Sequence, residues 1–192
     1  MNSEEARKLA ETTLSKERFY HTECVARAAE ALAKRHGADP EAAKLAGYLH
    51  DIAKERDKDD LLQMIEGSDI IDFDEIRQCP QVWHAYAGGV WAREELSVSD
   101  DIAGAIAHHT TAAASMTKLE MIVFIADFIS EDRGYDETYD MRELAFESLE
   151  SAVLGIVERQ VRHIMNSRRY MDINIIRAYN DLIGRLRDTG DI

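Results

Sequence analysis

The sequence predicts an all-α protein, a helical bundle that spans residues 1–192 as one domain. Apolar residues recur at helical spacing from end to end, whereas the strict alternation typical of strands is absent. Only two prolines occur among the 192 residues, and no glycine- and serine-rich linker divides the chain. The length also fits one domain, because domains commonly contain about 100–200 residues.

The first three predicted helices are recognised by their capping residues. Ser3 is the expected N-cap of the first helix, and the two glutamates that follow it favour the positive end of the helix dipole. The second helix is predicted over about 17–35. Asp39 followed by Pro40 is typical of an N-cap and a first helical position, so a third helix is expected from there through Lys54.

The rest of the chain is predicted to continue as helices. The charged segment 55–60 indicates a solvated helix start, and further helices are expected over about 80–96, 99–109 and 117–129. Two amphipathic helices within about 138–188 complete the fold, and they either close the core or form a homodimer interface. Their apolar stripes consist of Phe146, Leu149, Val153, Ile156 and Val157 in one and Ile175, Ala178, Tyr179, Leu182 and Leu186 in the other.

The chain is acidic, with 37 aspartates and glutamates against 23 lysines and arginines and a formal charge of -14 at pH 7. This balance argues against nucleic acid and anionic membranes as partners, because both attract basic surfaces. The longest apolar run, residues 121–126, is too short to cross a bilayer, and the first ten residues contain no secretory signal. Because Cys24 and Cys79 are isolated from each other, we expect a cytoplasmic protein whose thiols are packing residues.

Several ionisable residues lie inside apolar helical runs. His50 and Asp51 interrupt the run 45–53, and Asp127 interrupts the run 121–129. A buried carboxylate must find a cation, strong hydrogen-bond donors or a metal, because burying it unpaired is very costly. Taken singly, each of these residues could be satisfied by backbone amides or an arginine. Five of the seven histidines, however, lie within such runs or at their edges, namely His21, His50, His84, His108 and His109.

Together these residues predict a metal site inside the bundle, with ligands from five helices. Imidazoles mixed with carboxylates, and without thiolates, suit iron, manganese or zinc. Six ligands exceed what one four-coordinate metal needs, so two metals that share Asp51 use them more naturally. Such a pair generates a hydroxide nucleophile at neutral pH and is suited to phosphoryl transfer.

The ordered set of motifs resembles the HD-domain metal phosphohydrolase superfamily, and within it the YqeK-type symmetrical bis(5′-nucleosyl)-tetraphosphatases. The resemblance covers nearly the whole chain and is most specific in residues 18–22, 49–54, 109–111, 119–133 and 142–145. It implies hydrolysis of diadenosine tetraphosphate at its centre to two ADP, at a dinuclear site usually assigned to iron, with manganese or zinc as alternatives. The substrate would thus be a small nucleotide.

The resemblance also implies residue roles. His21, His50, Asp51 and Asp127 would hold one metal, while Asp51, His84 and His109 would hold the other. The sequence departs from the family pattern at Ala112, where a glycine is common, and at Glu131, where a proline is usual.

Four further residues are candidates for substrate contacts. Lys54 lies one helical turn after Asp51 and would reach a phosphate oxygen as a catalytic or binding group, although it would equally suit a solvated position beside Glu55. Arg133 would bind phosphate or pair with a neighbouring acidic residue. Thr110 and Thr111 would donate hydrogen bonds to substrate, or one of them would cap a helix. The other two histidines, His36 and His163, are expected at the surface.

Other functions remain open at this point. The same ligands would serve an HD-type phosphohydrolase acting on another nucleotide or an alarmone. A di-iron oxygenase on a related fold and a non-catalytic binding module are two further classes, and the second is disfavoured because all six ligand positions are filled.

Overall fold

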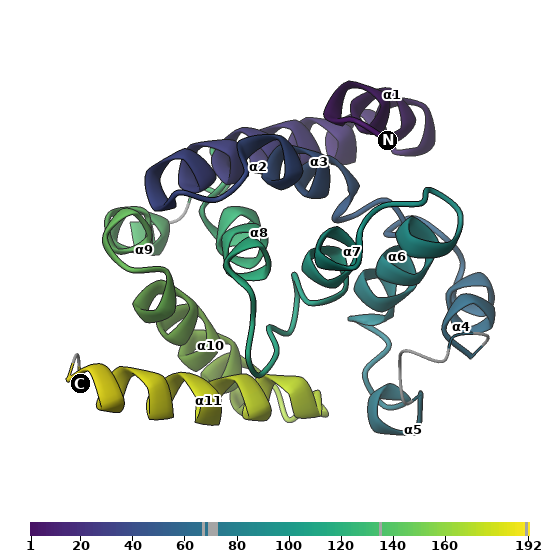
Figure 1. Ribbon diagram of the computed structural model, residues 1–192. Helices are drawn as coiled ribbons and strands as arrows, with labels where there is room; N and C mark the ends of the chain where they lie inside the picture. The colour runs from purple at the N-terminus through teal and green to yellow at the C-terminus, as the bar shows by residue number, and fades with distance from the viewer. Residues whose placement is uncertain (67, 69–72, 135, 191) are drawn as a thin grey trace.

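The computed structural model describes residues 1–66, 68, 73–134, 136–190 and 192, and every regular element in these ranges is a helix (Figure 1). The predicted all-α class is therefore confirmed. The helices, in chain order, are α1 (Ser3–Thr13), α2 (Lys16–His36), α3 (Pro40–Leu49), α4 (Lys58–Glu66), α5 (Phe73–Ile76), α6 (Trp83–Glu94), α7 (Asp100–Ala107), α8 (Lys118–Ile129), α9 (Asp136–Glu147), α10 (Leu149–Asn166) and α11 (Ile173–Thr189).

The helices α7 and α8 occupy the middle of the bundle, with α1–α3 along one side, α4–α6 along another and α9–α11 along a third (Figure 1). The largest buried apolar cluster joins α2, α8, α10 and α11. Two glycines allow close packing at the helix crossings. A Cβ on Gly47 would lie 2.7 Å from the Ala26 Cα, and one on Gly89 would lie 2.8 Å from the Ala103 carbonyl oxygen. These close contacts hold α3 against α2 and α6 against α7.

The sequence predicts the N-cap of α3 correctly but not that of α1. Asn2, rather than Ser3, caps α1, because its Oδ1 accepts from the Glu5 amide in a capping box while the Ser3 amide donates to a side chain of α3. Asp39 caps α3 as predicted, accepting from the Glu41 and Ala42 amides.

Two helices end earlier than the sequence predicts, and both ends lie at predicted site residues. α3 ends at Leu49, and residues 50–56 follow as tight turns in which Ile52 and Lys54 donate their amides three residues back. α7 ends at Ala107, so His108 and His109 also lie in turns. A hydrophobic pattern does not distinguish an i to i-4 turn from an i to i-3 turn, which explains why the helices were expected through Lys54 and residue 109.

The C-terminal part contains three helices where two were expected. Phe146 belongs to α9, separated from Leu149 by the N-cap Ser148, and is 39% exposed. Tyr179 is likewise 36% exposed, so neither aromatic residue belongs to the buried stripe that was predicted. The other stripe residues are buried in the core, namely Leu149, Val153, Ile156, Val157, Ile175, Ala178, Leu182 and Leu186.

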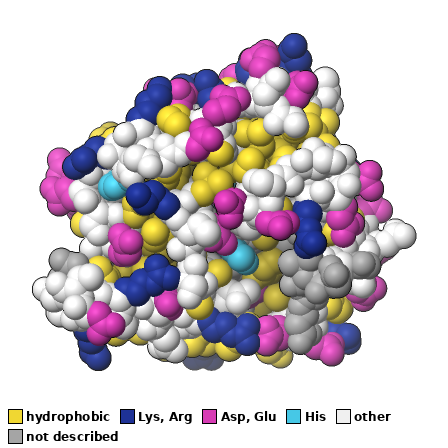
Figure 2. All heavy atoms as spheres, in the orientation of Figure 1, with side chains coloured by type: hydrophobic (Ala, Val, Ile, Leu, Met, Phe, Trp, Pro, Cys, Tyr) yellow, Lys and Arg dark blue, Asp and Glu magenta, His cyan; other side chains and the backbone are white. Residues whose placement is uncertain are grey.

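The charged segment 55–60 is only partly helical, since α4 begins at Lys58. The short α5 was not anticipated. On the face shown in Figure 2, acidic and basic side chains are interspersed around visible apolar surface, so the negative charge is not gathered in one patch there. Within the described ranges, the helices are all too short or too polar to cross a membrane.

Candidate metal centre

The structure brings together all six residues that the sequence suggested as metal ligands. His21 comes from α2, His84 from α6 and Asp127 from α8, while the others lie in the turns after α3 and α7. Potential ligand atoms form two groups, each within 4.8 Å: His21, His50 and Asp51 in one, and Asp51, His84 and His109 in the other. Asp51 belongs to both groups, as a bridging ligand would.

Two of the histidine rings are held with a lone pair directed at the centre. The Nδ1 atoms of His50 and His109 lie 2.7 Å from the carbonyl oxygens of Gly47 and Ile106, respectively. A carbonyl only accepts, so in the neutral rings each Nδ1 carries the proton and each Nε2 is an acceptor. His50 is fully buried, and its Nε2 has no hydrogen-bond partner.

Asp51 is an ionised carboxylate in the middle of these rings. Its Oδ1 lies 3.3 Å from the Nε2 of His84 and 3.5 Å from that of His109, and it has no hydrogen-bond partner. Burial raises the pKa of Asp51, but the surrounding histidines, His50 first among them, hold it well below its ordinary value. Its Oδ2 accepts from the Arg18 guanidinium at 2.9 Å.

Asp127 and His21 form the second side of the centre. The Nε2 of His21 lies 3.0 Å from the Asp127 Oδ1, which also accepts from Arg133 at 2.8 Å. Although burial raises the pKa of Asp127, the hydrogen bond to His21 and the nearby positive groups lower it far below the ordinary value. The Nδ1 of His21 lies 2.7 Å from the Oδ2 of Asp132, in the turn after α8.

Asp132 and Arg18 are functional candidates that sequence reasoning missed. Asp132 was considered only as a neighbour of Arg133, yet it lies behind the His21 ring, where a carboxylate orients a metal-binding imidazole. Arg18 was noticed only as part of a motif. No periodicity signals either role, because both depend on a contact between distant segments.

Lys54 lies at the edge of the centre, where its side chain is 35% exposed and its ammonium contacts the clustered residues. Its Nζ lies 3.0 Å from the Nε2 of His84 and 4.0 Å from the Asp51 Oδ1. Burial lowers the pKa of Lys54, and the Asp51 carboxylate opposes this shift. Burial also lowers the pKa of His84 to about 4, so this ring is neutral near pH 7 and accepts from the ammonium.

The donor set fits divalent metal ions. The Nε2 of His50 and the Oδ1 of Asp51 are buried acceptors without donors, and unpaired buried acceptors are costly. The edge-to-face rings of His21, His50, His84 and His109 have neighbouring centroids 4.9–5.3 Å apart. Imidazole nitrogens and carboxylate oxygens that converge in this way suit a divalent cation, which would satisfy all of them at once.

The remaining predicted residues occupy different positions. Thr111 is fully buried, and its hydroxyl donates to the Ala112 carbonyl. The Thr110 hydroxyl is buried without a partner. Arg133 donates to the carboxylate of Asp127, and Glu131 instead pairs with Arg27.

The three histidines outside the centre differ in environment. His108 pairs with Glu120 at 2.6 Å, so His109 alone of the two neighbours faces Asp51. His36 is half-buried, and its Nε2 lies 2.7 Å from the Ala145 carbonyl oxygen, which corrects the expectation of a free surface residue. His163 is exposed, as expected.

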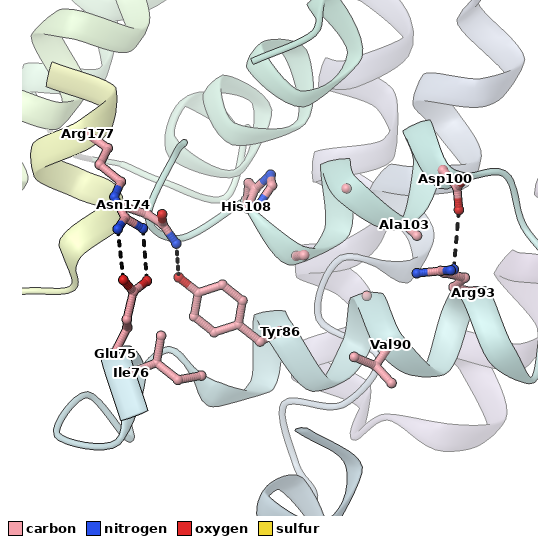
Figure 3. Close-up of a pocket in the computed structure, with 13 residues that line it drawn as sticks. Glu75, Ile76, Tyr86, Val90, Arg93, Asp100, Ala103, His108, Asn174 and Arg177 are labelled. Atoms are coloured by element: carbon pink, nitrogen blue, oxygen red, sulfur yellow. Dashed lines mark hydrogen bonds and ion pairs between the residues drawn. The ribbon is translucent and has the colours of Figure 1, made fainter. Parts of the chain in front are cut away.

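A separate cavity of about 460 Å³ lies between α6, α7 and α11 (Figure 3). Its charged residues pair with one another: Glu75 binds Arg177 through two contacts of 2.8 and 2.9 Å, and Arg93 lies 3.3 Å from Asp100. Asn174 donates to the hydroxyl of Tyr86. None of the six clustered residues lines this cavity, so it is distinct from the centre.

Comparison with known proteins identifies relatives over nearly the full length. The symmetrical bis(5′-nucleosyl)-tetraphosphatase of Bacillus subtilis strain 168 is 32% identical, with 95% of this chain and 98% of that protein covered. The protein of the same name from Halalkalibacterium halodurans is 31% identical, with the same coverage. A crystal structure described as a predicted HD superfamily hydrolase involved in NAD metabolism, from Clostridium acetobutylicum, gives a TM-score of 0.89 at 28% identity, covering 95% of this chain and 97% of that one.

The family model of the HD domain matches residues 18–132. This range begins three residues before His21 and includes every member of the histidine and aspartate cluster, as well as Asp132 at its end. The fold, the clustered residues and the sequence match agree, and the chain belongs to the HD domain family.

Proposed function

We propose that this protein is a metal-dependent phosphohydrolase that cleaves diadenosine tetraphosphate symmetrically into two ADP. The observation that supports this most strongly is the buried cluster in which acceptors of Asp51 and His50 lack donors. The near-full-length similarity to symmetrical bis(5′-nucleosyl)-tetraphosphatases suggests the substrate. The whole chain would act as one domain, in which α9, α10 and α11 form one side of the helical bundle.

The proposed cofactor is a pair of divalent metal ions, with iron favoured and manganese or zinc as alternatives. His21, His50, Asp51 and Asp127 would hold one ion, and Asp51, His84 and His109 the other. When bound, the metals would supply an activated water and neutralise charge on the phosphates.

Three cationic side chains at the rim of the centre would bind and orient the phosphates. Arg18, Lys54 and Arg133 have side chains that are 31%, 35% and 34% exposed, so each combines a contact to the centre with access from solvent. If a metal binds the Nε2 of His84, the Lys54 ammonium would lose this nitrogen as its hydrogen-bond acceptor. A phosphate oxygen of the substrate would then take the place of the nitrogen. These cations would attract a polyanionic substrate to a chain whose formal charge is -14.

Asp132 would act as a positioning residue for the metal ligand His21. By accepting from the Nδ1 of His21, it would keep the His21 Nε2 directed at the centre.

An anaerobic assay with diadenosine tetraphosphate tests the proposal. The protein would be loaded in parallel with iron, manganese and zinc, and the products identified by mass spectrometry. ADP as the only nucleotide product would support symmetrical cleavage, whereas ATP together with AMP would contradict it. A Lys54→Ala variant is expected to raise the KM, and an unchanged KM would remove Lys54 from phosphate binding.

A further inference from the structure

The turn after α8 carries two adjacent residues that contact the metal centre. The Asp132 carboxylate lies 2.7 Å from the Nδ1 of His21, and Arg133 donates to the Oδ1 of Asp127 at 2.8 Å. The two contacts reach different helices, because His21 belongs to α2 and Asp127 to α8. Both contacts depend on the path of one short backbone segment, so whatever holds that segment in place affects both sides of the centre.

Arg142, a half-buried residue of α9, binds the backbone of this turn. Its Nε donates to the Ile129 carbonyl at 2.8 Å, and its Nη2 donates to the carbonyls of Ser130 and Arg133 at 2.9 and 3.3 Å. The last carbonyls of a helix have no partner within the helix, so a planar group with several donors suits the end of α8. The Arg133 carbonyl also accepts from the Thr138 hydroxyl at 3.2 Å. The turn is therefore bound to α9 at both of its ends.

The turn has a backbone conformation that proline can adopt. The Arg133 amide donates to the Ser130 carbonyl at 2.9 Å, which defines a β-turn with Glu131 and Asp132 at its centre. Neither central residue is among the described residues with a positive φ, which fits type I and excludes types II, I′ and II′. The Ser130 ψ of 152° suits a residue that precedes proline, and within the described part of the chain the Glu131 amide makes no backbone hydrogen bond. Glu131→Pro should therefore stiffen the turn without removing a backbone hydrogen bond.

Arg142 itself belongs to neither group of potential metal ligands. Its hydrogen bonds within the described part of the chain go to backbone carbonyls, and its guanidinium carbon lies 5.2 Å from the ring centroid of Tyr139, which is 62% exposed. It also lies beyond residues 18–132, the range that the family model of the HD domain matches. Any influence of α9 on the centre through Arg142 therefore passes through the backbone of the turn.

We propose that Arg142 is a positioning residue for the metal centre. By fixing the turn after α8, it holds the Asp132 carboxylate behind the His21 ring and the Arg133 guanidinium on Asp127. Without its guanidinium both contacts weaken together, although no residue of the centre has been removed. The inference rests on the proposed function only for the presence of the metals, because the turn can be observed in metal-free protein.

Four variants test this role. Arg142→Ala removes the three carbonyl contacts, and Arg142→Lys keeps the charge without the planar fork. The matched control is Tyr139→Ala, which changes an exposed residue of the same helix that touches the guanidinium and leaves the carbonyl contacts in place. Glu131→Pro, alone and combined with Arg142→Ala, tests rescue, because proline restricts the turn through its own ring. Circular dichroism and thermal unfolding would establish that each variant is folded.

Hydrogen exchange of the Arg133 amide, measured by NMR on metal-free protein, reports whether the turn is closed. We expect this exchange to be about tenfold faster in Arg142→Ala, intermediate in Arg142→Lys and unchanged in Tyr139→Ala, because local opening sets the exchange rate. In competition with a chelator, Arg142→Ala should bind manganese about tenfold more weakly, the lower end of the range for residues that orient a metal ligand. Adding Glu131→Pro should reduce both changes to about threefold.

The rescue separates positioning from a merely structural contact. A lower unfolding temperature of Arg142→Ala with wild-type manganese affinity would overturn the inference, and so would a loss of affinity that Glu131→Pro leaves unchanged. If Arg142→Ala does not fold, Arg142→Lys is compared with Tyr139→Ala in the same two measurements, and equal values in both would overturn the inference. 

The same variants separate this inference from the proposed function. If manganese affinity follows the exchange of the turn but the wild-type protein does not cleave diadenosine tetraphosphate, the role of Arg142 stands and the proposed reaction fails. If the wild type cleaves that substrate and Arg142→Ala matches Tyr139→Ala in both manganese affinity and KM, the reaction stands and the role of Arg142 fails.

Discussion

The metal centre and the hydrogen-bond network around Tyr86 are both polar regions of the interior, but they differ in how their donors and acceptors are paired. In the metal centre, acceptors face acceptors: the Oδ1 of Asp51 lies 3.3 Å from the Nε2 of His84 and 3.5 Å from that of His109. In the network beside the cavity of Figure 3, donors meet acceptors. The hydroxyl of Tyr86 donates to Asp172 at 3.0 Å and accepts from Asn174 at 3.0 Å.

This difference separates a binding site from structural polar packing. An unsatisfied buried polar group costs about 1–3 kcal/mol, so the centre gains free energy when a cation arrives, whereas the Tyr86 network has nothing to gain from one. Burial alone does not distinguish them, because Asp51, Tyr86 and Asp172 are all buried. Substitutions in the two regions should therefore have different consequences.

The largest expected effect is that of Asp51→Ala. Because Asp51 belongs to both ligand groups, its removal should abolish retention of both metals and lower turnover by at least about a thousandfold. Metal analysis and an activity assay would measure this, with circular dichroism expected to show a largely helical protein. Retained metal and activity would remove Asp51 from the centre.

Asp132→Ala should have a smaller effect on the same region. Losing the carboxylate behind His21 is expected to weaken metal affinity by about 10–100-fold, a typical result for residues that orient a ligand. Competition with a chelator would measure the affinity. The control is Glu131→Ala, at an adjacent carboxylate whose side chain is 75% exposed. If both variants lose affinity equally, the effect is general charge and not orientation.

The sequence predicted the six clustered residues because an ionisable group in an apolar helical run has no solvent face on which to lie. It did not predict Asp132 or Arg18, whose roles arise when the turn after α8 and the first turn of α2 meet the centre. Nor did it predict that His50 and Asp51 lie beyond the end of α3, since the apolar pattern continues through the tight turns. The separation of α9 from α10 was missed for a related reason, as only one residue, Ser148, interrupts the helical pattern.

Tyr86→Phe tests the hydrogen-bond network around Tyr86, where donors and acceptors are already paired. It removes a hydroxyl that bridges Asp172 and Asn174, so the free energy of unfolding should fall by about 1–3 kcal/mol. Denaturant unfolding would measure the loss. Metal content should stay at the wild-type level, and a parallel loss of metal would show that the two regions are not independent.

The smallest expected effect is a pH dependence of the metal-free protein that comes from His84. Its folded pKa is about 4, below the ordinary 6.5, so the unfolded state takes up a proton first as the pH falls. The stability contributed by His84 is fully present above pH 6.5 and is lost towards pH 4, by about 0.7 kcal/mol between pH 7 and pH 6.

Unfolding of the wild type and of His84→Ala at each pH isolates this contribution. The comparison is needed because His21 acts in the opposite sense: burial lowers its pKa, but Asp127 and Asp132 raise it above the ordinary value overall. The difference in stability between the two proteins should shrink as the pH falls from 7 to 6. A constant difference would contradict a neutral His84 in the folded protein.

The most direct test of the metal-centre account is to count metals and identify products on one preparation. Protein purified anaerobically without chelator should contain about two equivalents of divalent metal and convert diadenosine tetraphosphate to ADP alone, and chelation should abolish both. Activity that persists in protein shown to be free of metal would contradict the account.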